Sequence, residues 1–177
     1  MDLHRLLLER HSIRRYTDAE IEADKVKTIL EAALLAPSSK SKRPWQFIVV
    51  DDRETLTKLM ACKPAGAVSL KTAMLAVVVV SDPGESDVFI EDTSVAAAFM
   101  QLQAAALGIG SCWVQIRNRF SEDGEAAEVM VQNLLEIPQY LQVECIVTFG
   151  YPDEQRKPVD TEKLLWEKVH IGKWTQR

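Results

Sequence analysis

The sequence has little cysteine and histidine, and it lacks several well-known catalytic patterns. It contains three cysteines, three histidines and no CxxC pair among 177 residues. Neither a disulfide framework nor a metal site is therefore expected, and the cysteines at 62, 112 and 145 are predicted to be small buried side chains. The GxSxG, HExxH and Walker A patterns are also missing, which excludes the familiar hydrolase and NTPase routes.

Long apolar runs are missing as well. No run reaches the ~18 residues of a membrane-spanning helix, and the uncharged stretch 93–116 is broken by glutamine and glycine. The opening Met-Asp-Leu-His-Arg has no apolar stretch of the kind found in secretion signals. The net charge of −5 argues against a nucleic-acid partner. We therefore expect a cytoplasmic protein that binds neither membrane nor nucleic acid.

The charge is unevenly distributed along a chain of single-domain length. Residues 1–63 carry a net charge of +2 and residues 64–177 a net charge of −7. The cations of the first part gather at 10–15 and 40–43, beside serines in expected loops. Such clusters are usually solvated surface charge, but cations beside hydroxyls also suit an anionic ligand.

The apolar periodicity predicts alternating helices and strands. Helices are expected at 3–10, 22–36, 52–60, 91–107 and 122–135, with a helical piece near 65–72. Strands are expected at 46–50, 74–80, 111–116 and 141–149. Four consecutive valines in 74–80 are typical of a strand buried on both faces, and the apolar helix 91–107 is expected to be central.

The residues after the last strand form a tail without a core of its own. Residues 151–177 include two leucines and two tryptophans, at 164, 165, 166 and 174, with little periodicity. Large apolar side chains are not left in water without a cost, so the tail must lie across another surface. We therefore divide the chain into a domain, 1–150, and an arm, 151–177.

The segment Arg-His-Ser-Ile-Arg-Arg at 10–15 is a candidate anion site. In an extended strand, residues two apart face the same side, so Arg10, Ser12 and Arg14 would project together while Ile13 faces the core. Two guanidinium groups with a hydroxyl between them suit a phosphate. A plain surface patch is an equally good interpretation of these residues alone.

Gly108-Ile109-Gly110 is not a dinucleotide-binding fingerprint, because it follows a helix and precedes a strand and lacks the third glycine. It indicates either helix termination with close packing or the approach of backbone to a flat ligand. The loop 37–44 has three hydroxyls and three cations between two prolines, and it can offer many donors to an anion.

Four blocks together resemble the nitroreductase family of FMN-dependent oxidoreductases. They are Arg-His-Ser-Ile-Arg-Arg-Tyr at 10–16, Ala-Pro-Ser-Ser and Arg-Pro-Trp-Gln-Phe within 36–47, Ala-Leu-Gly-Ile-Gly-Ser-Cys-Trp at 106–113, and Gly-Tyr-Pro at 150–152. Their order and spacing match the family's. The Glu-Lys-Val-His ending at 167–170 resembles a compact subgroup with a Lys-Val-His C-terminal arm.

The resemblance implies an α+β fold with a central, mostly antiparallel sheet wrapped by helices. It also implies an intertwined homodimer that binds FMN at its interface and extends the C-terminal arm over the partner. The implied activity is hydride transfer from NAD(P)H through the flavin to a small acceptor such as a nitroaromatic or a quinone, in ping-pong order. An FMN-binding storage or sensor module without turnover is the alternative.

The resemblance also implies a set of cofactor-binding residues. These are Arg10, His11, Ser12 and Arg14 near the phosphate and ribityl chain; Pro37, Ser38, Ser39 and Ser41 in a loop from the partner; Ile109 and Gly110 beside the ring; and Arg156 near the phosphate. Lys157 or Lys168 could replace Arg156. No side chain is required as a catalytic acid or base.

This chain departs from the family pattern at several positions. Ser41 and Arg43 stand where asparagine and glutamine are common, and Ala98-Phe99 replaces Gln-Asn. These changes affect contacts to the pyrimidine edge of the flavin rather than to its phosphate. We expect Arg14, Lys42 or Arg43 to stabilise the negative charge of the reduced ring.

Overall fold

A four-stranded antiparallel sheet forms the centre of the molecule, in a computed structural model that describes residues 2–174. Its strands are β1 (Trp45–Val50), β2 (Leu75–Ser81), β3 (Gly110–Gln115) and β4 (Gln142–Gly150), in the order β1-β2-β4-β3. All three strand pairings are antiparallel, which confirms the predicted α+β class. Every residue of β2 is buried, as its valine run predicts.

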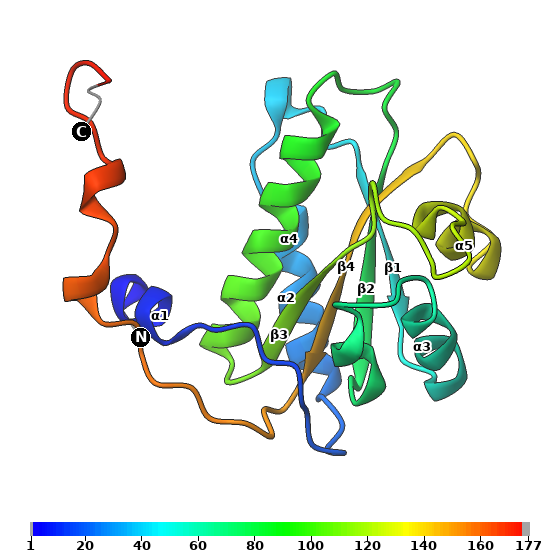
Figure 1. Ribbon diagram of the computed structural model, residues 1–177, viewed down its shortest axis with the longest axis horizontal. Helices are drawn as coiled ribbons and strands as arrows, with labels where there is room; N and C mark the ends of the chain where they lie inside the picture. Colours follow the sequence, from blue (N-terminus) through cyan, green and yellow to red (C-terminus); the bar gives the residue numbers. More distant parts are fainter. Residues whose placement is uncertain (1, 175–177) are drawn as a thin grey trace.

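Helices cover both faces of the sheet (Figure 1). Helices α2 (Ala23–Leu34) and α4 (Phe89–Ala106) pack on one face, and α3 (Arg53–Met60) and α5 (Ala127–Leu134) pack on the other. Successive residues of β2 point to opposite faces, so Val77 joins the α2–α4 core while Val78 joins the α3–α5 core. This alternation explains why β2 is apolar at every position.

Two helix predictions were wrong in extent. The helix expected at 122–135 begins at Ala127, because Ser121 closes a turn by accepting the Glu125 N–H and Gly124 adopts a φ of +82°. The piece expected at 65–72 is a single 3-10 turn, Val68–Lys71. The remaining helices and strands begin and end within about two residues of the predicted bounds.

The chain leaves the sheet after β4 as an extended arm. Val159 N–H donates to Leu8 O at 2.8 Å, which fixes the arm beside helix α1 (Leu3–Glu9), and two 3-10 turns follow at Thr161–Lys163 and Trp166–Lys168. Trp166 is 67% exposed and Ile171 is 96% exposed. The later part of the arm, 164–174, therefore has its large apolar side chains uncovered by the rest of residues 2–174 (Figure 1). No helix within residues 2–174 is long and apolar enough to cross a membrane.

Candidate functional site

The segment 10–17 lies in extended conformation across the ends of β3 and β4. Ile13 N–H donates to Ser111 O at 2.9 Å, and Thr17 N–H donates to Tyr151 O at 2.9 Å. Ser12 also forms a parallel bridge with Ser111. Ile13 is buried as predicted and its neighbours on both sides are not, but the alternation does not continue, because Arg15 is exposed and Tyr16 is buried.

Tyr16 anchors the segment to the sheet. Its hydroxyl donates to Ile13 O at 2.6 Å and lies 2.9 Å from Thr148 Oγ1, and burial raises the pKa of this phenol well above its usual range. A Cβ on Gly150 would lie 2.7 Å from Tyr16 Cβ, which leaves room there only for glycine. These contacts hold the residues before Tyr16 in a fixed position.

Gly110 allows an equally close approach on the other side of the segment. A Cβ at this position would meet Ile13 Cβ at 2.9 Å and Ile13 Cγ2 at 3.0 Å. Gly108 ends helix α4 with a φ of +75°, a conformation that favours glycine. Close packing therefore explains the glycine at 110, and backbone conformation explains the glycine at 108. Residues 108–110 also border a cavity.

This cavity, which we call the cradle, lies between α1, segment 10–13 and the end of α4. It measures about 160 Å³, and four predicted site residues line it: Arg10, His11, Ile109 and Gly110. Small-molecule sites usually measure roughly 300–1,000 Å³. The cradle of a single chain is therefore large enough for only part of a cofactor.

Two polar groups at the cradle lack partners within residues 2–174. His11 Nε2 is buried without a hydrogen bond, although buried polar atoms are almost always paired. The half-buried Arg10 guanidinium takes part in none of the hydrogen bonds or ion pairs of the described chain. The Arg10 guanidinium can therefore donate to a ligand that accepts hydrogen bonds, such as a phosphate, and the buried His11 Nε2 still lacks a partner within the described residues.

Ser12 and Arg14 lie in the same segment, outside the set of residues that lines the cradle. The exposed Arg14 guanidinium has one long contact, 3.5 Å from Nη1 to Ser12 O. Its backbone N–H donates to Glu154 Oε1 at 2.6 Å. Arg14 therefore keeps a free cationic end beside the cradle while its backbone is fixed.

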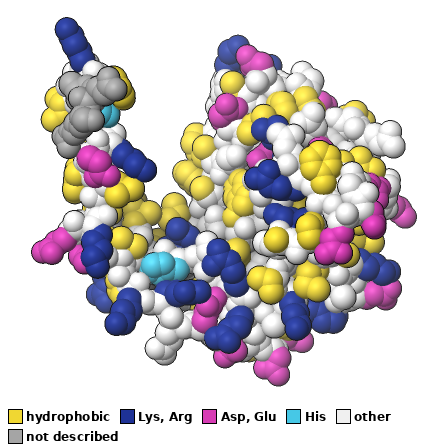
Figure 2. Space-filling model, viewed as in Figure 1, with side chains coloured by type: hydrophobic (Ala, Val, Ile, Leu, Met, Phe, Trp, Pro, Cys, Tyr) yellow, Lys and Arg dark blue, Asp and Glu magenta, His cyan; other side chains and the backbone are white. Residues whose placement is uncertain are grey.

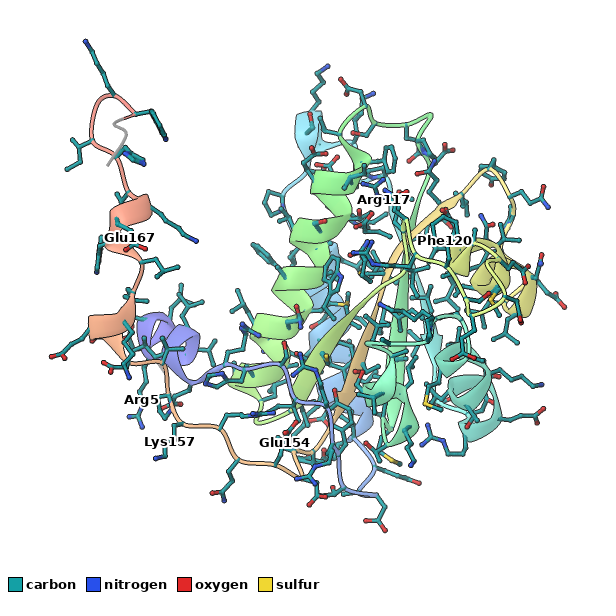
Figure 3. The ribbon with its side chains drawn as sticks, in the orientation of Figure 1. Arg5, Arg117, Phe120, Glu154, Lys157 and Glu167 are labelled. Atoms are coloured by element: carbon teal, nitrogen blue, oxygen red, sulfur yellow. The ribbon has the colours of Figure 1, made fainter. Side chains whose placement is uncertain are left out.

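Glu154 is a site-adjacent residue that the sequence patterns did not indicate. Its second oxygen accepts from Arg156 Nη2 at 2.9 Å, and the Arg14 N–H together with the nearby Arg156 holds the pKa of this carboxyl below its usual range. Figure 3 shows Glu154 under the ends of β3 and β4 and Lys157 farther along the arm toward α1. Arg156, which was predicted to bind the phosphate, is thus paired with Glu154. In the sequence, the only sign of this ion pair is that the two residues lie two positions apart.

The loop 37–43 lies far from the cradle of its own chain. Ser39 N–H donates to Asp92 Oδ1 near the start of α4, whereas Ala105 at the end of α4 borders the cradle. At about 1.5 Å per residue, about 20 Å of helix separates Asp92 from Ala105. Figure 1 shows the loop and segment 10–16 at opposite ends of α4. The two groups of predicted residues therefore do not form one site within a single chain.

A larger cavity of about 690 Å³ lies elsewhere, and no predicted site residue lines it. Its lining includes two cations, Lys63 and Lys71, and two carboxylates, Glu122 and Asp123, so its charges largely cancel. Lys63 is already engaged, because its Nζ donates to Gln115 O at 3.1 Å. Within residues 2–174 no three potential metal ligands lie together, so neither cavity has the ligands of a metal centre.

Comparison with known proteins agrees with these features. An archaeal protein from Archaeoglobus fulgidus, named "Putative NADH dehydrogenase/NAD(P)H nitroreductase", is 35% identical over 175 residues, which cover 96% of this chain and 97% of the relative. The structure of an FMN-dependent nitroreductase from Clostridium difficile R20291 superposes with a TM-score of 0.94 at 46% identity, covering 97% and 99% of the two chains.

A more distant structure shares the fold alone. It is described as a "putative nitroreductase in complex with fmn" from Desulfovibrio desulfuricans, and it has a TM-score of 0.75 at 24% identity, covering 96% of this chain and 98% of its own. A family model described as "Nitroreductase family" matches residues 7–69 and 63–151, which include the first three sequence blocks and all of the fourth except Pro152. With nearly the whole domain matched in sequence and in structure, this chain belongs to the nitroreductase family.

Proposed function

We propose that this protein is an FMN-dependent oxidoreductase that transfers hydride from NAD(P)H to a small acceptor such as a nitroaromatic or a quinone. The observation on which this rests is the cradle, which Arg10 and His11 line together with Ile109 and Gly110, and where His11 Nε2 has no partner within residues 2–174. Relatives named as NAD(P)H nitroreductases and an FMN-dependent nitroreductase support the assignment.

The cradle residues fit the phosphate end of FMN. Arg10 offers a guanidinium fork and His11 a buried ring nitrogen that donates when it carries the proton, and Ser12, in the same segment outside the cradle lining, adds a hydroxyl. Arg156 is 48% exposed at its side chain and is paired with Glu154, so it would reach the phosphate only by leaving that carboxylate. We therefore assign the phosphate first to Arg10, His11 and Ser12.

The rest of the cofactor site would come from a second copy of the chain. About 20 Å of helix α4 separates the cradle from the loop that contains Pro37, Ser38, Ser39 and Ser41. These loop residues would therefore line the flavin bound by the partner. The outer face of α4 is also open, with Phe99 37% exposed and Ala98 exposed. A homodimer would cover this face and complete two sites at once.

The exposed apolar side chains of the arm support the same assembly, and we assign the arm, with its Lys-Val-His at 168–170, to the compact subgroup as part of this proposal. Leu165 and Trp166 are 56% and 67% exposed in the single chain. Figure 2 shows a deep hollow between the arm and the body, with Lys and Arg side chains along its lower rim. A partner filling this hollow would bury the apolar side chains of the arm and enclose the basic rim within the dimer.

When bound, FMN supplies the chemistry that accepts hydride from NAD(P)H and passes it to the acceptor, with both substrates using one open face in turn. The chain's own role is to hold the phosphate and to place a cation where the reduced ring is negative. Arg14 and Arg43 have free guanidinium ends for this purpose. Lys42 is a weaker candidate, because its Nζ donates to Glu85 O at 2.6 Å.

The absorption spectrum of the purified protein and anaerobic stopped-flow mixing test this proposal. We expect FMN to bind in about one equivalent per chain and to bleach rapidly with NADH or NADPH, followed by recovery on adding a quinone or nitroaromatic. Bound flavin that neither nucleotide bleaches would identify a storage or sensor module instead. A chain that cannot be loaded with FMN would refute both functions.

A further inference from the structure

The loop 38–43 has an unfavourable backbone conformation. Lys40, Ser41 and Arg43 have φ values of 52°, 55° and 51°, in the left-handed region that side chains with a Cβ rarely adopt. Each such residue costs free energy, and three of them within four positions persist only where surrounding contacts enforce them. The structure must therefore contain groups that hold this loop in place.

Asp92 is the principal group that does so. Its carboxylate is buried, at 5% exposure; Oδ1 accepts from Ser39 N–H at 2.8 Å and Oδ2 accepts from Ser86 Oγ at 3.0 Å. A buried carboxylate is costly unless its oxygens are satisfied, and here both have a donor. Lys42 adds a second tie from the loop to the same region, through Glu85 O.

The held loop presents outward a set of donors that have no partner within residues 2–174. No hydrogen bond or ion pair of the described chain includes the side chains of Lys40, Ser41 or Arg43, and all three residues are exposed. The Ser38 hydroxyl, in contrast, is hydrogen-bonded within the loop, because Ser38 Oγ accepts from Arg43 N–H at 2.9 Å. Strain and hydrogen bonding thus combine to arrange free hydroxyl and cationic groups on one exposed turn.

We propose that Asp92 is a positioning residue that holds the 38–43 loop ready to bind the flavin of the partner subunit. The inference rests on the proposed function, because that function gives the exposed donors their ligand. An unheld loop would have to be ordered when FMN binds, and this ordering weakens affinity, whereas a loop held in advance avoids that cost. Asp92 therefore acts on the cofactor without touching it.

Asp52 provides a matched control within the same chain. It also lies at a helix start, and its Oδ1 accepts from Thr55 N–H at 2.8 Å, but that bond closes only its own helix. Asp92 instead reaches a backbone amide 53 residues earlier in the chain. Loss of either carboxylate removes stabilisation from a helix start, and only loss of Asp92 releases the loop.

The experiment compares the full-length wild type with Asp92→Ala, Asp92→Asn and Asp52→Ala. Hydrogen exchange of peptides that cover 37–43 is measured without FMN, and the FMN dissociation constant is measured by fluorescence titration. For Asp92→Ala we expect exchange in 37–43 to accelerate about tenfold and the dissociation constant to rise about tenfold or more. Asp92→Asn should stay within about threefold of wild type, because its amide oxygen still accepts from Ser39 N–H and its NH₂ can donate to Ser86 Oγ.

The outcomes separate this inference from the proposed function. If the wild type binds FMN and Asp92→Ala binds it equally well, Asp92 does not position the loop for the cofactor. If Asp52→Ala weakens FMN binding as much as Asp92→Ala, the effect is general destabilisation and the inference fails. If the wild type does not bind FMN, the proposed function fails, and the exchange data alone then report whether Asp92 holds the loop. Should Asp92→Ala not fold, Ser86→Ala tests the same carboxylate, with faster exchange in 37–43 expected and unchanged exchange contradicting it.

Discussion

Replacing Gly110 with alanine should push segment 10–13 away from β3 and open the cradle. The new Cβ would lie 2.9 Å from Ile13 Cβ, 3.0 Å from Ile13 Cγ2 and 3.1 Å from Ile13 Cγ1. Ile13 is buried and its N–H is bonded to Ser111 O, so neither its side chain nor its backbone can move freely. Overpacking of this kind costs about 1–3 kcal/mol.

The cost should appear in both stability and affinity. For a chain of this size, about 1–3 kcal/mol lowers the melting temperature by roughly 2–12 °C. If the segment relaxes outward and must return to bind FMN, the same energy weakens binding by about fivefold to 150-fold. Differential scanning fluorimetry and an FMN fluorescence titration measure the two effects.

Gly124→Ala is the matched control for this prediction. Gly124 has a φ of +82° with nothing within 4 Å of its added Cβ, so alanine costs about 1–2 kcal/mol of backbone strain and causes no clash. It should lower the melting temperature and leave FMN affinity unchanged. A Gly110→Ala variant that loses stability yet binds FMN like the wild type would refute the assignment of segment 10–13 to the cofactor.

Three further outcomes are expected. Arg10→Ala should weaken FMN binding about tenfold or more, because it removes a charge-assisted donor pair, while the melting temperature without FMN changes little; titration and scanning fluorimetry measure both. Leu165→Ser with Trp166→Ser should yield monomers that lose FMN, as measured by light scattering on a sizing column; a dimer that persists would contradict the role of the arm. Tyr151→Phe should raise the pKa of Glu22 from about 2 toward its usual 4.5, because the Tyr151 hydroxyl donates to that carboxylate; carboxyl NMR measures this pKa. The depressed pKa contributes stability that is fully present above pH 4.5 and is lost as the pH falls toward 2, so the variant should lose less stability than the wild type over this range.

The sequence predicted the regular elements well because their causes are local or periodic. The valine run of β2, the i, i+4 pattern of α2 and the terminating Gly108 each follow from side-chain direction or backbone freedom. The side chain of Asp52 caps α3 by accepting from Thr55 N–H, a bond that spans only three residues. The burial of Ile13 was also predicted correctly, whereas the burial of Tyr16 does not follow from that alternation.

The site features that were missed depend on contacts between distant positions. Asp92 looks like an ordinary acidic residue in a first helical turn until the fold brings Ser39 to it. Glu154 likewise acquires its role only because the start of the arm passes beside Arg14. The left-handed residues of the 38–43 loop carry no glycine or asparagine signal, so no sequence rule for turns would have found them.

Helix α4 links these observations, because its length decides how a site can be assembled. It separates the cradle from the 38–43 loop by about 20 Å, and a single chain cannot bring them together without breaking the helix or the sheet beneath it. If both groups bind one FMN, they must come from different chains, and a twofold arrangement then gives each chain one half of two sites. Loss of FMN and loss of the dimer should therefore occur together on dilution, whereas an FMN affinity independent of protein concentration would mean that the cradle alone holds the cofactor.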